Sequence, residues 1–137
     1  MKKQALFSLL AAVVLLTAGS LNAQTSNPVK VNIPFDFSAG KSSFSAGEYR
    51  IDAISQLGDL AIAGRASSAK LVSSHPIQSA SPSSSTKLVF NKYGDRYFLS
   101  QIWVEGDDRG RELPQTREEK ELASNASPNP VVIMAQK

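Results

Sequence analysis

Cysteine is absent from this chain of 137 residues, and histidine occurs only once. A protein without cysteine forms no disulfide, holds no cysteine-based zinc site and performs no thiol redox chemistry. Its folded state must therefore depend on the burial of apolar side chains. The single histidine, His75, precedes Pro76 beside a serine-rich segment, and no serine lies in a G-x-S-x-G pattern, so the sequence contains no familiar hydrolytic motif.

Long apolar runs are also lacking, with one exception at the N-terminus. Lys2 and Lys3 are followed by an almost unbroken apolar run from Ala5 to Leu16. Small and polar residues come next, and Ala23 is suited to the last position before a cleavage site. This is the layout of a secretory signal peptide, and the run is shorter than the roughly 20 residues that a membrane-spanning helix needs.

We therefore expect residues 1–23 to be a cleaved Sec-type signal peptide and the mature protein to begin at Gln24. A bacterial lipoprotein needs a cysteine at the cleavage site, so no lipid anchor is expected here. The mature protein should be periplasmic or secreted, with no stable membrane anchor. Residues 24–137 are enough for a single domain with a modest core.

An excess of charge of one sign is missing too. The full chain has 15 basic and 12 acidic residues, and the signal peptide contains two of the basic ones. Both signs are mixed along the rest of the sequence and form no basic stripe. We therefore do not expect a nucleic-acid partner.

What the sequence does contain is a series of short β patterns. The segment "VKVNIPFDF", residues 29–37, alternates strictly between apolar and polar positions, which predicts a half-buried strand. Pro34 cannot donate a ladder hydrogen bond, so it favours an edge strand or a bulge. Shorter apolar segments follow, and "NPVVIMAQ" predicts a last strand paired into the sheet.

The segment from Lys87 to Val104 predicts a β-hairpin. Gly94 and Asp95 fit the central pair of a type II′ turn. This turn places Phe90 opposite Leu99. The expected register puts side chains on two faces: Leu88, Phe90, Lys92, Tyr97, Leu99, Gln101 and Trp103 on one, and Val89, Phe98, Ile102 and Val104 on the other.

Two segments interrupt the β pattern. Residues 73–86 are rich in serine and predict a mobile loop. Thr116 and Glu119 have the spacing of a capping box, and the residues that follow are helix formers. We therefore expect an all-β fold, a single antiparallel β-sandwich or partly open barrel of about seven short strands, with one short helix near the C-terminus.

Four motifs in residues 29–124, "IPFDF", "AGEY", "YGDRYFL" and "GRELPQTREEKEL", resemble those of a family of small exported proteins of acidobacterial and related soil bacteria. As a set they are distinctive. The resemblance implies an exported bacterial protein. It implies no activity, and none of the motifs is a catalytic signature.

The concentration of aromatic residues in the hairpin suggests a ligand site. Tyr93, Tyr97 and the sole tryptophan, Trp103, would form an aromatic platform for a sugar if they were exposed. The alternative is that these rings belong to the core, as most aromatic side chains in strands do. Exposure of the rings distinguishes the two interpretations.

A second candidate site lies just after the hairpin. Glu105, Asp107 and Asp108 are carboxylates beside two glycines, and oxygen ligands on a flexible loop suit Ca²⁺. The EF-hand spacing is absent, and Arg109 and Arg111 lie within the cluster. The alternative is a solvated turn with local ion pairs.

Two classes of function remain. The first is an exported non-catalytic binding or interaction module of the bacterial cell envelope, with a glycan or an envelope protein as its partner and no cofactor. The second is a small hydrolase or lyase whose site is formed by carboxylates that converge in space, with Asp36, Glu48, Asp52 and Glu105 as candidates. A binding module needs an exposed apolar or aromatic patch, whereas an enzyme of this kind needs convergent acids in a cleft.

Overall fold

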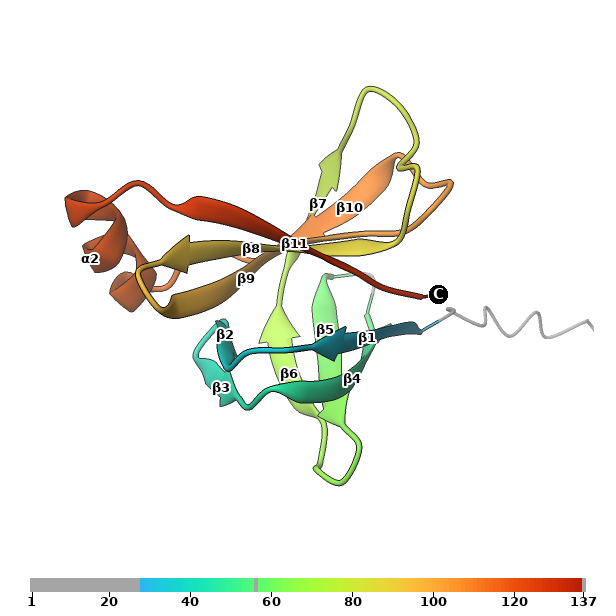
Figure 1. Cartoon of the computed structure of the whole chain (residues 1–137). Coiled ribbons are helices and arrows are strands. Elements are labelled where there is room, and N and C mark those ends of the chain that lie inside the picture. The colour runs from blue at the N-terminus through green and yellow to red at the C-terminus, as the bar shows by residue number, and fades with distance from the viewer. Residues whose placement is uncertain (1–27, 56, 137) are drawn as a thin grey trace, which may run out of the picture.

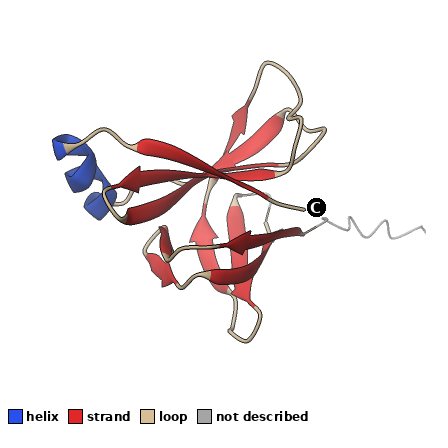
Figure 2. Cartoon of the chain, viewed as in Figure 1, coloured by secondary structure: helices blue, strands red, loops and turns tan. Residues whose placement is uncertain are grey.

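The computed structural model describes residues 28–55 and 57–136, so the signal peptide expected at residues 1–23 lies outside the described residues. The described part folds into eleven strands and one helix, in two sheets that lie over one another (Figures 1 and 2). Within this part of the chain, no helix is both long and apolar enough to cross a membrane. The predicted all-β class with one short C-terminal helix is confirmed.

The small sheet has four antiparallel strands in the order β1-β4-β5-β6. Its strands are β1 (Val29–Ile33), β4 (Gly47–Ala53), β5 (Asp59–Gly64) and β6 (Lys70–Ser73). In β1 the apolar residues are buried and the polar residues exposed, as the alternating sequence predicts. The strand ends before Pro34 and forms an edge of the sheet, which agrees with the position expected for this proline.

The large sheet has seven strands. Five of them follow the order β11-β8-β9-β10-β7, and β2 and β3 form a small hairpin that joins at β9. The five are β11 (Asn129–Met134), β8 (Lys87–Tyr93), β9 (Arg96–Trp103), β10 (Arg109–Glu112) and β7 (His75–Gln78), and the small hairpin is β2 (Phe37–Ala39) and β3 (Ser42–Phe44). The count exceeds the expected seven because β2, β3, β7 and β10 have only three or four residues each, too few to show a period of two.

The two sheets are joined at two corners. On one side β6 continues into β7 after the single residue Ser74. On the other side Lys30 of β1 exchanges backbone hydrogen bonds of 2.7 and 2.8 Å with Gln136, just beyond β11. Between these corners the inner faces of both sheets enclose one core, and β1 and β11 diverge, so no closed barrel forms.

The core is built from side chains of both sheets. Ile33 and Ile62 from the small sheet, and Leu88 and Phe90 from the large sheet, are completely or almost completely buried. Burial of such side chains contributes roughly 1.5–3 kcal/mol each, which is the main source of stability in a protein without disulfides. Phe37 packs edge-on against Phe90 with a centroid separation of 5.5 Å.

The β8–β9 hairpin has the predicted turn. Gly94 has a φ of 62°, and no residue other than glycine has a positive φ in the described chain, as a type II′ turn with Gly94 and Asp95 at its centre requires. Phe90 lies opposite Leu99 as expected. A β-bulge then interrupts the register between Val89 and Phe90, so the expected faces of Gln101, Ile102, Trp103 and Val104 are wrong.

The bulge places one extra residue, Ser100, in β9. Leu88 consequently lies opposite Ile102 instead of Gln101. Ile102 is buried in the core, while Gln101 and Trp103 move to the outer side. A shift of one residue reverses the face of every side chain beyond it, which is why the sequence pattern alone gave the opposite assignment for these residues.

The serine-rich segment 73–86 is not one continuous loop. Ser73 ends β6, and His75–Gln78 form β7, which pairs with β10 in register. Pro76 is tolerated because β7 lies at a sheet edge. The rest of the segment is held by backbone hydrogen bonds, including those from Ser79 to Asp108 and from Ser83 to Asp107.

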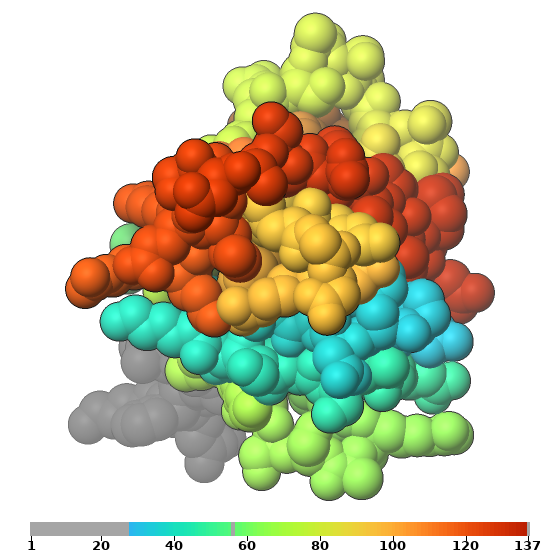
Figure 3. All heavy atoms as spheres, turned by 60° about the vertical axis from the view of Figure 1, so that its left-hand side comes forward, coloured from blue at the N-terminus to red at the C-terminus, as the bar shows by residue number. Residues whose placement is uncertain are grey.

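Helix α2 (Arg117–Asn125) begins at the predicted cap, where the Thr116 side chain accepts a hydrogen bond from the Glu119 N–H. The Glu119 carboxylate does not complete a capping box. It is 5% exposed and accepts hydrogen bonds from the Asn91 amide at 3.1 Å and the Tyr93 hydroxyl at 3.3 Å. The helix is thereby attached to the end of the hairpin, and Figure 3 shows α2 and β11 bordering the hairpin on one side and the β2–β3 region on the other.

Candidate binding face on the large sheet

The expected platform of Tyr93, Tyr97 and Trp103 is not formed, because the three rings have different environments. Tyr93 is 5% exposed and packs edge-on against Phe98 under α2. Tyr97 faces the core and stacks on Phe35 with a centroid separation of 3.7 Å. Only Trp103 lies on the solvent side of the large sheet, outside the core cluster.

The surroundings of Trp103 are set by two rows of residues that cross the five main strands of the large sheet. Both rows flank an inward row that contains the buried residues Leu88 and Ile102. Since neighbouring residues in a strand point to opposite faces, the two rows share the outer side, and we call them the outer face. One row is Met134, Lys87, Trp103, Gly110 and Ile77, and the other is Val132, Val89, Gln101, Glu112 and His75.

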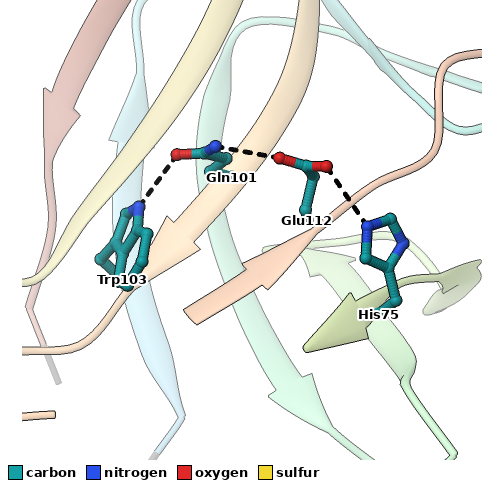
Figure 4. A network of polar contacts seen from close by, with 4 residues as sticks. All are labelled: His75, Gln101, Trp103 and Glu112. Atoms are coloured by element: carbon teal, nitrogen blue, oxygen red, sulfur yellow. Dashed lines mark hydrogen bonds and ion pairs between the residues drawn. The ribbon is translucent and has the colours of Figure 1, made fainter. Parts of the chain in front are cut away.

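A chain of polar contacts runs across the outer face (Figure 4). The Trp103 indole N–H donates to Gln101 Oε1 at 3.1 Å, and the Gln101 amide donates to Glu112 Oε2 at 3.0 Å. The other Glu112 oxygen lies 3.2 Å from His75 Nε2. Because a carboxylate can only accept, this last contact requires a proton on Nε2. The chain fixes the orientation of an amide, a carboxylate and an imidazole beside the indole ring.

The imidazole and the carboxylate of this chain remain open to solvent. The His75 and Glu112 side chains are 52% and 37% exposed, so both can form additional hydrogen bonds with a ligand. Glu112 has free lone pairs that can accept hydrogen bonds. The second ring nitrogen of His75 can donate or accept one. A flat ring beside several hydrogen-bonding groups is suited to a ligand that has both apolar and hydroxyl-rich surfaces.

An apolar rim adjoins the polar chain on the β11 side. Val132 is 50% exposed and Met134 is 61% exposed, and both belong to the outer face. Val89, between Val132 and Gln101, is partly buried. Along the row from Val132 to His75, the outer face therefore changes from apolar at β11 to polar at β7.

The carboxylates after the hairpin do not form a metal centre. Within the described residues, no group of three or more His, Asp or Glu side chains is close enough to hold a metal ion. Asp107 instead accepts a hydrogen bond from the Arg109 N–H, and Asp108 accepts one from Gln78. Glu105 forms an isolated bridge with Ser83. These contacts hold the segment as a loop against β7. This arrangement corresponds to the alternative interpretation, a solvated turn.

Two hollows lie elsewhere on the described surface, and neither is lined by Trp103. A hollow of about 610 Å³ lies where β1 and β11 diverge, and Lys30, Arg50, Arg65 and Met134 are among its lining residues. A smaller hollow of about 310 Å³ lies beside the β2–β3 hairpin. In the larger one, Arg65 is paired with Glu48 at 3.4 Å.

Comparisons with known proteins add no constraint to this geometry: no family model, no curated protein and no solved structure matches the chain. The class of protein must therefore be inferred from the residues and their arrangement.

Sequence reasoning found Trp103 but missed its partners. Gln101 lies two residues away in the same strand, so its place beside the ring follows from simple alternation once the bulge is known. Glu112 and His75 are brought there by the pairing of β9 with β10 and of β10 with β7. No local signal in the sequence indicates these pairings.

Proposed function

We propose that this protein is an exported, non-catalytic binding module of the bacterial cell envelope, and that the outer face of the large sheet binds a glycan. The observation that carries the proposal is the position of Trp103 on the solvent side, hydrogen-bonded into the row formed by Gln101, Glu112 and His75. An indole ring packs on the apolar face of a pyranose, and amide, carboxylate and imidazole groups bind its hydroxyls.

Export is supported by the sequence before the described residues. The basic start, the apolar run and Ala23 have the layout of a signal peptide, and the resemblance to a family of small exported proteins points the same way. A protein without cysteine is also indifferent to an oxidising compartment.

The geometry favours binding over the alternative of a carboxylate hydrolase or lyase. Three of the four candidate carboxylates have separate partners: Asp36 accepts from the Ala46 N–H, Glu48 pairs with Arg65, and Asp52 pairs with Arg50 at 2.9 Å. The partners of these acids are spread over different parts of the small sheet and its loops. The hydrogen-bonded row of Trp103, Gln101, Glu112 and His75 is on the other sheet.

The proposal can be tested by titrating the exported protein with soluble glycans and peptidoglycan fragments. Trp103 is the sole tryptophan, so its fluorescence reports directly on the outer face. We expect saturable quenching or a blue shift as a sugar covers the ring. Glu112→Gln should weaken binding by removing a charged acceptor, at a cost of about 1.5–3 kcal/mol.

Arg65→Ala, in the turn that follows β5 of the small sheet, provides the control and should bind like the wild-type protein. A fluorescence signal that responds to none of these sugars, or a Glu112→Gln variant that binds as tightly as the wild type, would rule out a glycan site here. Export is checked separately by the intact mass of the protein from the periplasm and the medium: the expected N-terminus is Gln24, and a protein that keeps Lys2 and Lys3 would contradict it.

A further inference from the structure

We infer that strand β11 is a dimerisation edge, through which two copies of this chain join their large sheets into one continuous sheet. The strand is the first in the order of the large sheet, so only one of its sides is paired, with β8. The unpaired backbone groups and the exposed side chains of β11 together form a surface that is complementary to the same surface of a second copy. The inference does not depend on glycan binding.

Hydrogen bonds at the end of the strand show which backbone groups are unpaired. The Ala135 N–H donates to the Thr86 carbonyl, whereas the next residue, Gln136, exchanges hydrogen bonds with Lys30. Backbone groups alternate in direction along a strand. Those of Val132 and Met134 therefore point away from β8, toward the side on which no described strand pairs with them.

Space is available beside this edge. The hollow of about 610 Å³ extends along Met134, Ala135 and Gln136, because β1 departs from β11 after the Lys30–Gln136 pair. The edge has little of the usual protection against another strand, and what it has is confined to one end, at Pro130. It has no charged residue between Asn129 and Met134, and Pro130 is its only residue without an N–H.

The register of a second copy follows from the positions of the free groups. If Ile133 lies opposite Ile133 of the other copy, on a two-fold axis, Val132 of each copy faces Met134 of the other. The outward N–H and C=O of these residues then form four intermolecular hydrogen bonds. The pairing ends before Gln136, because Lys30 of the same chain already occupies the place beside it. Pro130, which would come opposite Gln136 in this register, has no N–H to pair, so the second copy leaves the sheet at that residue.

The side chains agree with this register. Val132 and Met134 are 50% and 61% exposed, and they lie on the same outer side of the sheet. In the dimer each Val132 would pack directly against the partner's Met134, which removes two exposed apolar contacts per copy from water. This self-complementary match favours a second copy over an unrelated extended peptide.

A dimer of this kind would place both outer faces on the same side, because the two-fold axis is perpendicular to the sheet. The two Trp103 residues would then lie five strand spacings apart, about 24 Å. The result is one surface with two equivalent sites instead of two separate surfaces.

The test is the mass of the exported protein in solution, measured by sedimentation and by light scattering from micromolar to millimolar concentration. We expect a reversible dimer. Val132→Pro deletes the outward N–H, which β8 does not use, and also alters the side chain that contacts Met134. It should weaken the dimer at least about thirtyfold, because one hydrogen bond per copy is removed. Val132→Thr keeps that N–H and the side-chain shape, so it should remain a dimer.

Exchange of charges tests the register without touching the backbone. The double variant Val132→Lys with Met134→Lys places like charges opposite each other and should be monomeric. Val132→Lys with Met134→Glu places the introduced lysine of each copy opposite the introduced glutamate of the other and should restore the dimer. Circular dichroism verifies that each variant is folded.

A wild-type protein that is monomeric throughout this concentration range would overturn the inference, even if it captured an added peptide along β11. A dimer that survives both Val132→Pro and the double lysine variant would also overturn it, since its interface would lie elsewhere. Failure of the lysine–glutamate variant to recover the dimer would exclude this register.

Discussion

The indole ring of Trp103 lies directly against the backbone of Gly110 on the neighbouring strand. A Cβ atom added at position 110 would approach the ring carbon Cε3 to 2.7 Å, closer than two carbon atoms can come without displacement. Gly110 has no positive φ, so what the position requires is space and not backbone freedom. The glycine thus allows the ring to lie flat across β10.

Gly110→Ala should therefore displace the ring. We expect a loss of about 1–3 kcal/mol in the free energy of unfolding, because overpacking forces the side chain away from its preferred position. The emission of Trp103 should move to longer wavelength as the ring turns toward water. Urea denaturation and the emission maximum measure the two effects.

A double-mutant cycle with Trp103→Ala isolates the contact between the two residues. Without the indole ring, Gly110→Ala should have little cost. An equal loss of stability in both backgrounds would show that the ring does not depend on this glycine.

Glu119 should be far more important for stability than its neighbour Glu118. Glu119→Ala leaves the partly buried Asn91 amide and the buried Tyr93 hydroxyl without their acceptor and should cost about 1–3 kcal/mol. Glu118 pairs with Arg96 where both side chains are about half exposed, so Glu118→Ala should cost roughly 0–1 kcal/mol. Thermal unfolding of the two variants gives the comparison, and similar losses for both would contradict this assignment.

Alkaline pH should destabilise the fold through Tyr93. Burial, followed by the negative charge of Glu119, raises the pKa of the Tyr93 hydroxyl above its ordinary value of 10.0. The folded state therefore keeps the phenolic proton to a higher pH than the unfolded state does. The resulting stability is complete below pH 10 and is lost as the pH rises from the unfolded pKa through the folded one.

Tyr93→Phe should reduce this alkaline loss, while lowering stability at neutral pH by about 1 kcal/mol through the missing hydrogen bond to Glu119. Burial also raises the pKa of Tyr49, so the double variant with Tyr49→Phe should reduce the loss further. The midpoint of urea denaturation as a function of pH measures both. A Tyr93→Phe protein that keeps the full alkaline loss would show that the Tyr93 pKa is not its source.

Local patterns in the sequence were sufficient for the parts of the fold that local chemistry determines. Gly94 is at a turn position that requires positive φ, so the hairpin and its nearest register could be derived from a few residues. Thr116 likewise marks the start of α2, because the cap satisfies an N–H within the same turn.

The candidate site was less predictable because distant pairing creates it. The bulge at Ser100 turns Trp103 to the outer side, and nothing in the alternating pattern reveals one extra residue. His75 reaches Glu112 only because β7, which contains a proline, finds its place beside β10. Glu119 was expected to cap the helix, whereas its side chain accepts a hydrogen bond from Asn91 of the hairpin.

The direct connection from β6 through Ser74 into β7 couples the stability of the two sheets. Val72 is buried in the small sheet, and five residues later Ile77 pairs with Gly110 in the large sheet, while the Ser74 N–H and hydroxyl both donate to the Gly58 carbonyl. If β6 detached, the anchor of β7 would be lost as well, and His75 would leave Glu112. We therefore expect sub-global opening of the small sheet and loss of the polar chain beside Trp103 to occur together, so that amide exchange in β6 and in β7 reports the same opening free energy.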